Sequence, residues 1–570
     1  MLNHFKLHFN PVNENERPDE LDNLPTFVEQ LRKISSTVDI DNEPPTIDEI
    51  TKHLQKLKNK KANNDIDSEL LKHCECPTLI NAIHQMTLNV WNNLDIPPAW
   101  GNSRLQTLWK GKGSKKDPTK YRGLSIGSTV CKLIVNIILS RLQPWYEAQL
   151  TDEQNGFRQD RGTTDGIYNI KRIQQISNRK LQPLYLVFVD LSAAFDHIPR
   201  KWMFDSIKLR FENNQSSLLI DILEKLYENT SLTMEETTFE TTSGVRQGGP
   251  ESPNLFNLYI DFVMRVFLEK SRDFEEIEFF EHKYRLNLRA ISRNQRAKMR
   301  ESNQQSWGTS EIPWSGYADD LVLYLLSREG LQKSIEFLDK VFSCFGLAIN
   351  TTKTERMVLN VDDIPTTIAN LRGTDLRNVS IFRYLGAYIN CLEPSTGDSE
   401  VNQRIQLACS KFAELSNLLQ NFHINLRTRI SFLNCFVRSR LTYACQNWCL
   451  NTNQWNRLDI TYRTFLRRMV RNGFKQVDRE NNDFRLTITN EQLHILCGTH
   501  EISEFIKQQQ SSYTAHVIRM SNERSLKQLM FNDDTYRKRG RPIKTLLEQV
   551  ICDKNVSIDR FCTSSLNERV

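Results

Sequence analysis

The sequence GYADDLVLY, residues 316–324, sets two adjacent carboxylates, Asp319 and Asp320, within a run of apolar and aromatic residues. An unpaired carboxylate is costly to bury, so two of them side by side favour a bound divalent cation. A hairpin turn would present both side chains at its tip. A third carboxylate, Asp190, follows the strand-like run LYLVFV at 184–189. Three carboxylates can hold two Mg²⁺ ions roughly 3.5–4 Å apart, with Mn²⁺ as a substitute, and this arrangement supports in-line phosphoryl transfer.

Aspartate is also common in solvated turns, which is the alternative explanation of Asp319 and Asp320 taken alone. Asp190 at the end of a second strand, with Phe195 five residues later, argues against that alternative. Asp196 is different, because it follows the strand and is placed to cap the next helix. We therefore expect a structural role for Asp196.

The bulk composition is that of an ordinary soluble globular protein, with 39% hydrophobic and 25% charged residues. A chain of 570 residues is too long for one core and predicts roughly three to five domains or subdomains. The longest apolar runs are too short to cross a bilayer, and the amino terminus lacks the pattern of a secretory signal. We expect an intracellular protein with no membrane partner.

The twelve cysteines are scattered singly, with no C-x₂-C pair. The sequence HILCGTH at 494–500 contains residue types that bind zinc but lacks a matched second pair. Reduced thiols are the favoured interpretation.

The charge is unevenly distributed. Residues 1–50 are acidic and are expected to be a loosely structured extension up to about residue 45, after which Thr46 and Glu49 predict a capping box at a helix start. Residues 401–471 read as helices that carry eleven Lys or Arg residues against Glu414 and Asp459. Such a segment indicates a surface that follows nucleic-acid phosphates, and a helical bundle with solvated arginines is the alternative.

Two glycine-containing loops are candidates for substrate contact. The basic turn KGKGSKK at 110–116 suits a triphosphate, although a solvated loop explains it equally well. In VRQGGPESP at 245–253 two adjacent glycines let the backbone approach a substrate closely. The order of strands and helices around these loops predicts a mixed sheet with helices on one face, in a split-βαβ arrangement.

A basic run, RKRGRP at 537–542, lies near the carboxyl end. It suits insertion into a minor groove or a nuclear signal, and a solvated tail explains it as well.

These segments together resemble the reverse transcriptases of non-LTR (long interspersed) retrotransposons, particularly the endonuclease–reverse transcriptase group. The resemblance runs from about Glu49 to Arg471. Six motifs stand in the family's order: GFRxxRGTTD at 156–165, DxxxxFD at 190–196, RQGxPxSPxLFN at 246–257, YADD at 317–320, GLxINxxKT at 346–354 and YLG at 384–386. YADD alone is weak evidence, whereas six motifs in order are strong.

The resemblance implies a catalytic centre. Asp190 and Asp319 would be the principal metal ligands, and Asp320 would complete the site. Lys353 would protonate the leaving pyrophosphate. Phe195 would pack under the incoming sugar and exclude a 2′-hydroxyl.

It also implies contacts with the nucleic acid and the nucleotide. The residues implied for the nucleotide are Lys110, Arg122, Gln247 and Gly248, with Lys112 and Lys116 as alternatives to Lys110. The residues implied for template and primer are Arg158, Arg161, Tyr317, Tyr384, Leu385 and Gly386, the last three gripping the primer.

The fold implied is an α+β right-hand polymerase: fingers, a palm with an antiparallel split-βαβ sheet, and a helical thumb. The expected divisions are an acidic extension (1–50), fingers (51–183), palm (184–390), thumb (391–475) and a basic helical region (476–570).

The function implied is an RNA-directed DNA polymerase of a non-LTR retrotransposon that extends a target-derived primer. Its partners would be an RNA template, a DNA primer or target, dNTPs and a separate endonuclease, in nucleus and cytoplasm. The alternatives are a domesticated, non-catalytic nucleic-acid-binding protein and a maturase-like protein that folds RNA.

The chain departs from the family's pattern in places. Gly249 stands where an acidic residue is usual, Glu251 stands where Leu is common, and residues 58–67 have Asn where the family has Gly and Pro. The endonuclease usually encoded upstream is absent, so we expect a fragment, a truncation or a domesticated descendant.

Overall fold

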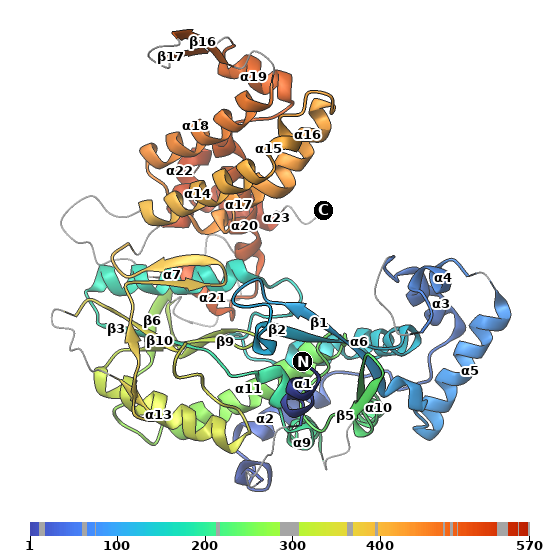
Figure 1. Ribbon diagram of the computed structural model, residues 1–570. Helices are drawn as coiled ribbons and strands as arrows, with labels where there is room; N and C mark the ends of the chain where they lie inside the picture. Colours follow the sequence, from blue (N-terminus) through green and yellow to red (C-terminus); the bar gives the residue numbers. More distant parts are fainter. Residues whose placement is uncertain are drawn as a thin grey trace.

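The structure is a computed structural model (Figure 1). It describes residues 1–10, 17–59, 65–74, 76–212, 217–285, 307–361, 369–393, 397–470, 474–478, 483–486, 488–532, 545–556 and 558–567. The basic run at 537–542 and the middle of the segment at 58–67 lie outside these ranges. No helix in these ranges is long and apolar enough to cross a membrane.

The first sheet has the strand order β2-β1-β4-β5. Its strands are β1 (Asn102–Trp109), β2 (Tyr121–Ile126), β4 (Ser231–Met234) and β5 (Thr237–Glu240). β1 pairs with β2 antiparallel across the basic turn and with β4 parallel. The sheet therefore joins segments that the sequence assigned to two different divisions, 51–183 and 184–390.

The amino-terminal extension is folded, which corrects the expectation of a loose segment. Helix α1 (Leu2–His8) packs Phe5 and Phe9 onto Leu105 and Phe239 of the first sheet. Helix α2 (Phe27–Ser36) has an apolar face that faces α6 (Thr129–Gln149). The polar composition of this segment hid these short amphipathic helices, because each buries only a few apolar side chains.

Three further helices lie beside α6, namely α3 (Ile47–Gln55), α4 (Ser68–Lys72) and α5 (Pro77–Asn93). Thr46 caps α3 by accepting a hydrogen bond from the Glu49 backbone N–H at 3.2 Å. The Glu49 carboxylate does not complete the expected capping box. It pairs with Arg141 of α6 at 2.6 Å instead, which fastens α3 to α6.

The central sheet has the order β13-β10-β3-β9-β8. Its strands are β3 (Leu184–Val189), β8 (Trp314–Tyr317), β9 (Asp320–Leu325), β10 (Glu355–Leu359) and the short β13 (Arg377–Asn378). β3 lies in the middle and pairs antiparallel with both β9 and β10. All six residues of β3 are buried, which explains its continuous apolar sequence.

Helices cover both faces of this sheet, so the expectation of helices on one face is wrong. One face packs on α11 (Ser252–Ser271) and α13 (Arg328–Cys344). The other packs on α7 (Thr163–Lys180) and on C-terminal helices α20 (Ile502–Arg519), α21 (Ser525–Met530), α22 (Leu546–Lys554) and α23 (Ile558–Asn567). The C-terminal region thus shares the core of the central sheet, and Figure 1 shows α7 between that sheet and the helices above it.

The helices above α7 form a separate apolar cluster. They are α14 (Asp398–Glu414), α15 (Ser416–Leu419), α16 (Leu426–Phe432), α17 (Ser439–Leu441), α18 (Thr452–Met469) and α19 (Asn490–Cys497). Two helices, α9 (Arg200–Lys208) and α10 (Leu218–Glu228), pack in the same core as α11. Four small hairpins are also present: β6 (Phe280–Arg285) with β7 (Trp307–Ile312), β11 (Asn370–Leu371) with β12 (Thr374–Asp375), β14 (Ile381–Tyr384) with β15 (Ala387–Asn390), and β16 (Phe474–Asp478) with β17 (Asp483–Leu486).

Much of the positive charge at 401–471 is used inside this cluster. Arg404, Arg429 and Arg467 are buried, and each donates hydrogen bonds to backbone carbonyl groups. Arg457 and Arg463 pair with Asp398 and Glu501. The net charge of the segment therefore overstated the charge offered to a nucleic acid, and Arg427, Arg440 and Arg468 are the arginines of this segment that stand exposed among its described residues.

Candidate active site

The two central aspartates lie at the hairpin between β8 and β9, as the sequence predicts. Tyr317 pairs with Asp320 across the turn, and Ala318 and Asp319 form its tip. Ala318 has a φ of 58°, in the left-handed region that is strained for a side chain. Its N–H donates to the Gln154 side chain at 2.9 Å, which helps to hold this conformation.

Asp190 lies at the same edge of the central sheet. Val189 of β3 is opposite Leu321 of β9, so Asp190 and Asp320 follow as the next residues on neighbouring strands. The Asp190 backbone is fixed by Thr354, whose hydroxyl accepts from its N–H at 3.3 Å, and by Asn350, whose N–H donates to its carbonyl at 2.8 Å. The strand register therefore brings together three carboxylates that are far apart in the sequence.

The carboxylates repel one another. Desolvation, followed by the charge of Asp190, raises the pKa of Asp319, while Arg122 and Lys353 act in the opposite direction. Desolvation, followed by the charges of Asp319 and Asp190, raises the pKa of Asp320 to about 6. Lys353 Nζ lies 3.0 Å from Asp190 Oδ2 and supplies part of the missing positive charge.

The donor set suits a hard divalent cation, because carboxylate oxygens are the ligands such ions prefer. Across the described ranges, however, no three His, Cys, Asp or Glu side chains are grouped closely enough to hold a metal ion. The aspartates are thus gathered at one edge without closing around a common point. The zinc-type residues at 494–500 are not grouped either: His494 lies beside Thr499 and Glu501, and Cys497 packs in the apolar cluster.

A loop at 153–156 braces the catalytic turn, and sequence reasoning missed it. Gly316 exchanges backbone hydrogen bonds with Glu153 and Asn155, at 2.9 and 2.8 Å. A Cβ on Gly156 would lie 2.4 Å from the backbone nitrogen of Ala318, so glycine is required at this close approach. Gly156, the first residue of the GFR motif, was the sequence signal that could have revealed this contact. A glycine is explained better by the close approach of the Ala318 backbone than by contact with a template.

The predicted template contacts Arg158 and Arg161 need correction, because both guanidinium groups are buried. Arg158 pairs with Glu147 at 2.9 Å, and Arg161 pairs with Asp152 at 2.9 Å, with side chains 2% and 6% exposed. Asp152 also pairs with Arg524 at 2.6 Å and accepts two hydrogen bonds from Ser525 at the start of α21. These arginines therefore support the bracing loop from within the fold.

The loop gives a prediction for pH. Desolvation, followed by the charge of Asp152, raises the pKa of Glu153 to about 7. A carboxyl group whose pKa is raised on folding stabilises the fold while protonated, and this contribution is lost as the pH rises from about 4.5 through 7. We expect Glu153→Gln to gain in melting temperature relative to the wild type as the pH is raised from 5 to 8. The same difference in melting temperature between variant and wild type at pH 5 and at pH 8 would contradict this expectation.

The side of the site predicted to meet the nucleotide is built from α8 (Ala194–His197) and the glycine loop at 245–253. Phe195 stacks on Phe256 with ring centroids 4.1 Å apart, so its ring is held flat at the edge of the core. Gln247 donates to the Asp196 carboxylate at 2.6 Å, and its carbonyl accepts from the Ser125 N–H of β2. Asp196 lies within α8 and caps no helix, which corrects the capping expectation; its carboxylate contacts Gln247 and His8 instead.

Gly248 fastens the same loop to the first sheet. It has a φ of 118°, and a Cβ there would lie 2.7 Å from the Ser125 carbonyl oxygen. Glycine is therefore required for the loop to lie against β2.

Three cations face the aspartates across the site. Burial, followed by the charges of Arg122 and Lys353, lowers the pKa of Lys110, so these three groups lie within electrostatic range of one another. Arg122 and Lys353 in turn act on Asp319. Of the three lysines left open by the sequence, all are exposed; Lys110 differs in lying within electrostatic range of Arg122 and Lys353, and its Nζ donates to the Thr119 carbonyl at 2.9 Å.

The proposed primer grip lies at the tip of the β14–β15 hairpin. Tyr384 is 2% exposed and packs beside Phe188, so its side chain cannot touch a primer, which corrects that prediction. Leu385 and Gly386 form the turn, and the Leu385 carbonyl accepts from the Tyr443 hydroxyl at 2.6 Å. Tyr317 is half-buried, with its ring 6.2 Å from that of Phe157.

Comparison with known proteins is consistent with this geometry. Residues 113–389 match the family described as reverse transcriptase (RNA-dependent DNA polymerase). The chain is similar to the Pol polyprotein of the type-1 retrotransposable element R2 of Nasonia vitripennis, with 23% identity over 381 residues, 60% of this chain and 33% of the relative.

Two proteins of Drosophila melanogaster are also similar. The Pol polyprotein of the type-2 element R2DM is 26% identical over 42% of this chain and 20% of its own length. The RNA-directed DNA polymerase of the mobile element jockey is 22% identical over 38% and 24%. The chain spans about a third or less of the length of these relatives.

Proposed function

We propose that this chain, whose residues 113–389 form a reverse transcriptase domain with homologues among non-LTR retrotransposons, is an RNA-directed DNA polymerase that extends a primer 3′-hydroxyl. The observation that carries the proposal is the meeting of Asp190, Asp319 and Asp320 at one edge of the central sheet, near the cations Arg122 and Lys353. Phosphoryl transfer needs carboxylates that hold metal ions and cations that bind phosphate groups. Neighbouring carboxylates at the ends of strands, with cations beside them, meet both needs.

Asp190 and Asp319 would hold two Mg²⁺ ions, or Mn²⁺ in their place, with Asp320 beside them. These ions would activate the primer hydroxyl and balance the charge of the triphosphate. The raised pKa values of Asp319 and Asp320 support this assignment, because desolvation and mutual repulsion of the carboxylates outweigh the nearby cations Arg122 and Lys353.

The remaining residues have roles that their positions suit. Lys110 and Arg122 bind the phosphates of the incoming dNTP. Lys353 pairs with Asp190 in the free protein and is positioned to turn toward the triphosphate, where it gives a proton to the leaving pyrophosphate. Gln247 and Gly248 line the nascent base pair from a loop fixed to β2.

The parts of the fold correspond to a right hand. The first sheet with α3 to α6 would be the fingers, the central sheet the palm, and the cluster of α14 to α19 the thumb. The partners would be an RNA template, a DNA primer made at a target site, dNTPs and a separate endonuclease, in nucleus and cytoplasm.

The test is primer extension by the full chain on an RNA template with dNTPs and Mg²⁺. We expect templated DNA synthesis that stops when the metal is chelated. Tight RNA binding with no extension under any divalent metal would instead favour a non-catalytic binder or a maturase-like protein.

Sugar selection gives a second prediction. The Phe195 ring is fixed against Phe256, so it forms a rigid wall where a 2′-hydroxyl would lie. We expect Phe195→Ala to raise incorporation of ribonucleotides relative to deoxyribonucleotides by about tenfold or more, since a steric clash of roughly 1.4 kcal/mol or greater is removed. Phe195→Tyr, which keeps the wall, is the matched control. An unchanged dNTP/rNTP ratio in single-nucleotide insertion kinetics would remove this role.

A further inference from the structure

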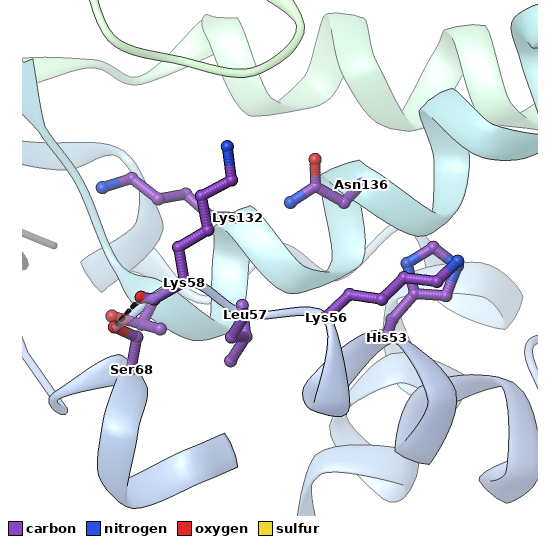
Figure 2. Close-up of a pocket in the computed structure, with 8 residues that line it drawn as sticks. His53, Lys56, Leu57, Lys58, Ser68, Lys132 and Asn136 are labelled. Atoms are coloured by element: carbon purple, nitrogen blue, oxygen red, sulfur yellow. Dashed lines mark hydrogen bonds between the residues drawn. The ribbon is translucent and has the colours of Figure 1, made fainter. Parts of the chain in front are cut away.

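A cavity of about 400 Å³ lies where the end of α3, the start of α4 and one face of α6 meet (Figure 2). The residues that define its chemistry are His53, Lys56, Lys58, Ser68, Lys132 and Asn136. None of them belongs to the catalytic centre described above. We refer to this cavity as the α3–α6 pocket.

The lining of the α3–α6 pocket is cationic. It includes three lysines and a histidine, and no acidic side chain lines it. Figure 2 shows Lys58 and Lys132 on one side of the cavity, Lys56 with His53 on the other, and Asn136 between the two groups. Among the described residues, no ion pair or side-chain hydrogen bond joins the ammonium groups of these lysines to a partner.

The positive charge of the pocket is partly offset by anions that do not line it. Burial lowers the pKa of Lys132, while the charges of Asp65 and Glu251 act in the opposite direction. Burial, followed by the charge of Lys56, lowers the pKa of His53, and Glu49 opposes this. The cations that line the cavity still outnumber the acidic side chains that line it, so an anionic ligand inside it is electrostatically favoured.

The position of Lys132 connects this pocket to the catalytic loop. A second, smaller cavity is lined by Lys132 together with Ser125, Gly248 and Gly249. Lys132 thus borders both spaces, and Thr129, Lys132 and Asn136 lie along one face of α6, at helical spacing, leading away from Gly248. A strand that passes the glycine loop would enter the α3–α6 pocket next.

We propose, resting on the proposed function, that the α3–α6 pocket binds one unpaired nucleotide of the single-stranded template before that strand reaches Gly248. Its phosphate lies between Lys58 and Lys132, and its base or ribose lies against Leu57 and the Asn136 amide. The volume fits one nucleotide and is too small for a duplex. Mixed lysine and amide groups beside an apolar side chain suit a flexible single strand.

The test measures the equilibrium affinity of the protein for two substrates in the absence of dNTPs. One is a primer–RNA template with a template overhang of about six nucleotides, and the other is a blunt-ended duplex of the same sequence. Lys58→Ala/Lys132→Ala is compared with Lys52→Ala/Lys201→Ala, which removes two exposed lysines outside the pocket.

The pocket variant should lose roughly tenfold in affinity for the overhang substrate and little for the blunt duplex, and its log–log salt slope should fall by about 0.7, the value for one phosphate of a single strand. The control variant should behave as the wild type. A photoreactive uridine at the overhang positions should crosslink to residues 53–58 or 129–136.

Two results with the pocket variant would overturn the proposal: an equal loss of affinity for both substrates, or no loss of affinity for either. A competition result with the wild type would also overturn it. If inorganic phosphate or free dNTP abolishes the extra affinity for the overhang substrate at concentrations that leave duplex binding unchanged, the pocket binds a free anion and not the template. Because no catalysis is measured, failure of primer extension would overturn the proposed function and leave the binding result standing as a separate finding.

Discussion

Asp319→Ala is expected to lower primer extension by at least about a thousandfold while leaving template–primer affinity within roughly twofold. The side chain stands at the tip of the hairpin, beside Asp320 and Asp190, where it would hold the metal ions. Losing such a ligand removes several kcal/mol of transition-state stabilisation, and about 4 kcal/mol corresponds to a thousandfold in rate. Extension is measured in single-turnover assays and affinity by fluorescence anisotropy.

The same substitution should not destabilise the fold. A raised pKa means that the ionised Asp319 carboxylate opposes folding near neutral pH, so its removal leaves the melting temperature equal or higher. Asp95→Ala, which removes an exposed carboxylate far from the site in sequence, is the matched control and should keep full activity. Retained extension in Asp319→Ala, or loss of RNA binding together with extension, would contradict the assignment.

Asp152→Ala is expected to destabilise the protein by about 3–5 kcal/mol, the usual cost of leaving buried charges without their partner. Asp152 lies between the largely buried guanidinium groups of Arg161 and Arg524 and accepts two hydrogen bonds from Ser525. It is therefore the link between the C-terminal helices and the loop at 153–156. Unfolding in urea, followed by circular dichroism, measures the free-energy difference.

This link also predicts an effect on catalysis. The loop at 153–156 holds the backbone of Gly316 and Ala318, so loosening it should lower kcat more than it raises KM for dNTP. Amide exchange should accelerate at residues 153–158 and 316–318. Ser525→Ala keeps the backbone donor and loses one hydroxyl, so it should cost only about 1 kcal/mol. A free energy of unfolding for Asp152→Ala within 1 kcal/mol of the wild type would disprove the link.

Local patterns in the sequence were sufficient for the elements around the site. The apolar run before Asp190 predicted β3, the run around Asp319 and Asp320 predicted the β8–β9 hairpin, and Thr46 predicted the start of α3. These features depend on side-chain periodicity and turn chemistry over a few residues, which any short stretch carries by itself.

The charged side chains were predicted less well. Arg429 and Arg467 carry the same charge as exposed arginines, yet each is buried and donates to a backbone carbonyl group of another segment, Met469 and Ile488 respectively. Whether an arginine meets solvent or a buried partner depends on which segments the fold brings together, and the sequence around it does not record this.

The sequence by itself predicted, through the order of its motifs, that three aspartates, Phe195 and a glycine loop belong to one chemical task, because residue type and order determine which reactive groups are present. Only the tertiary structure decided that the C-terminal helices share the core of the central sheet, that Gln154 and Gly156 brace the catalytic turn, and that lysines of α6 and the end of α3 enclose one cavity. These arrangements join segments up to hundreds of residues apart, and they follow from packing and strand register, which are properties of the whole folded chain.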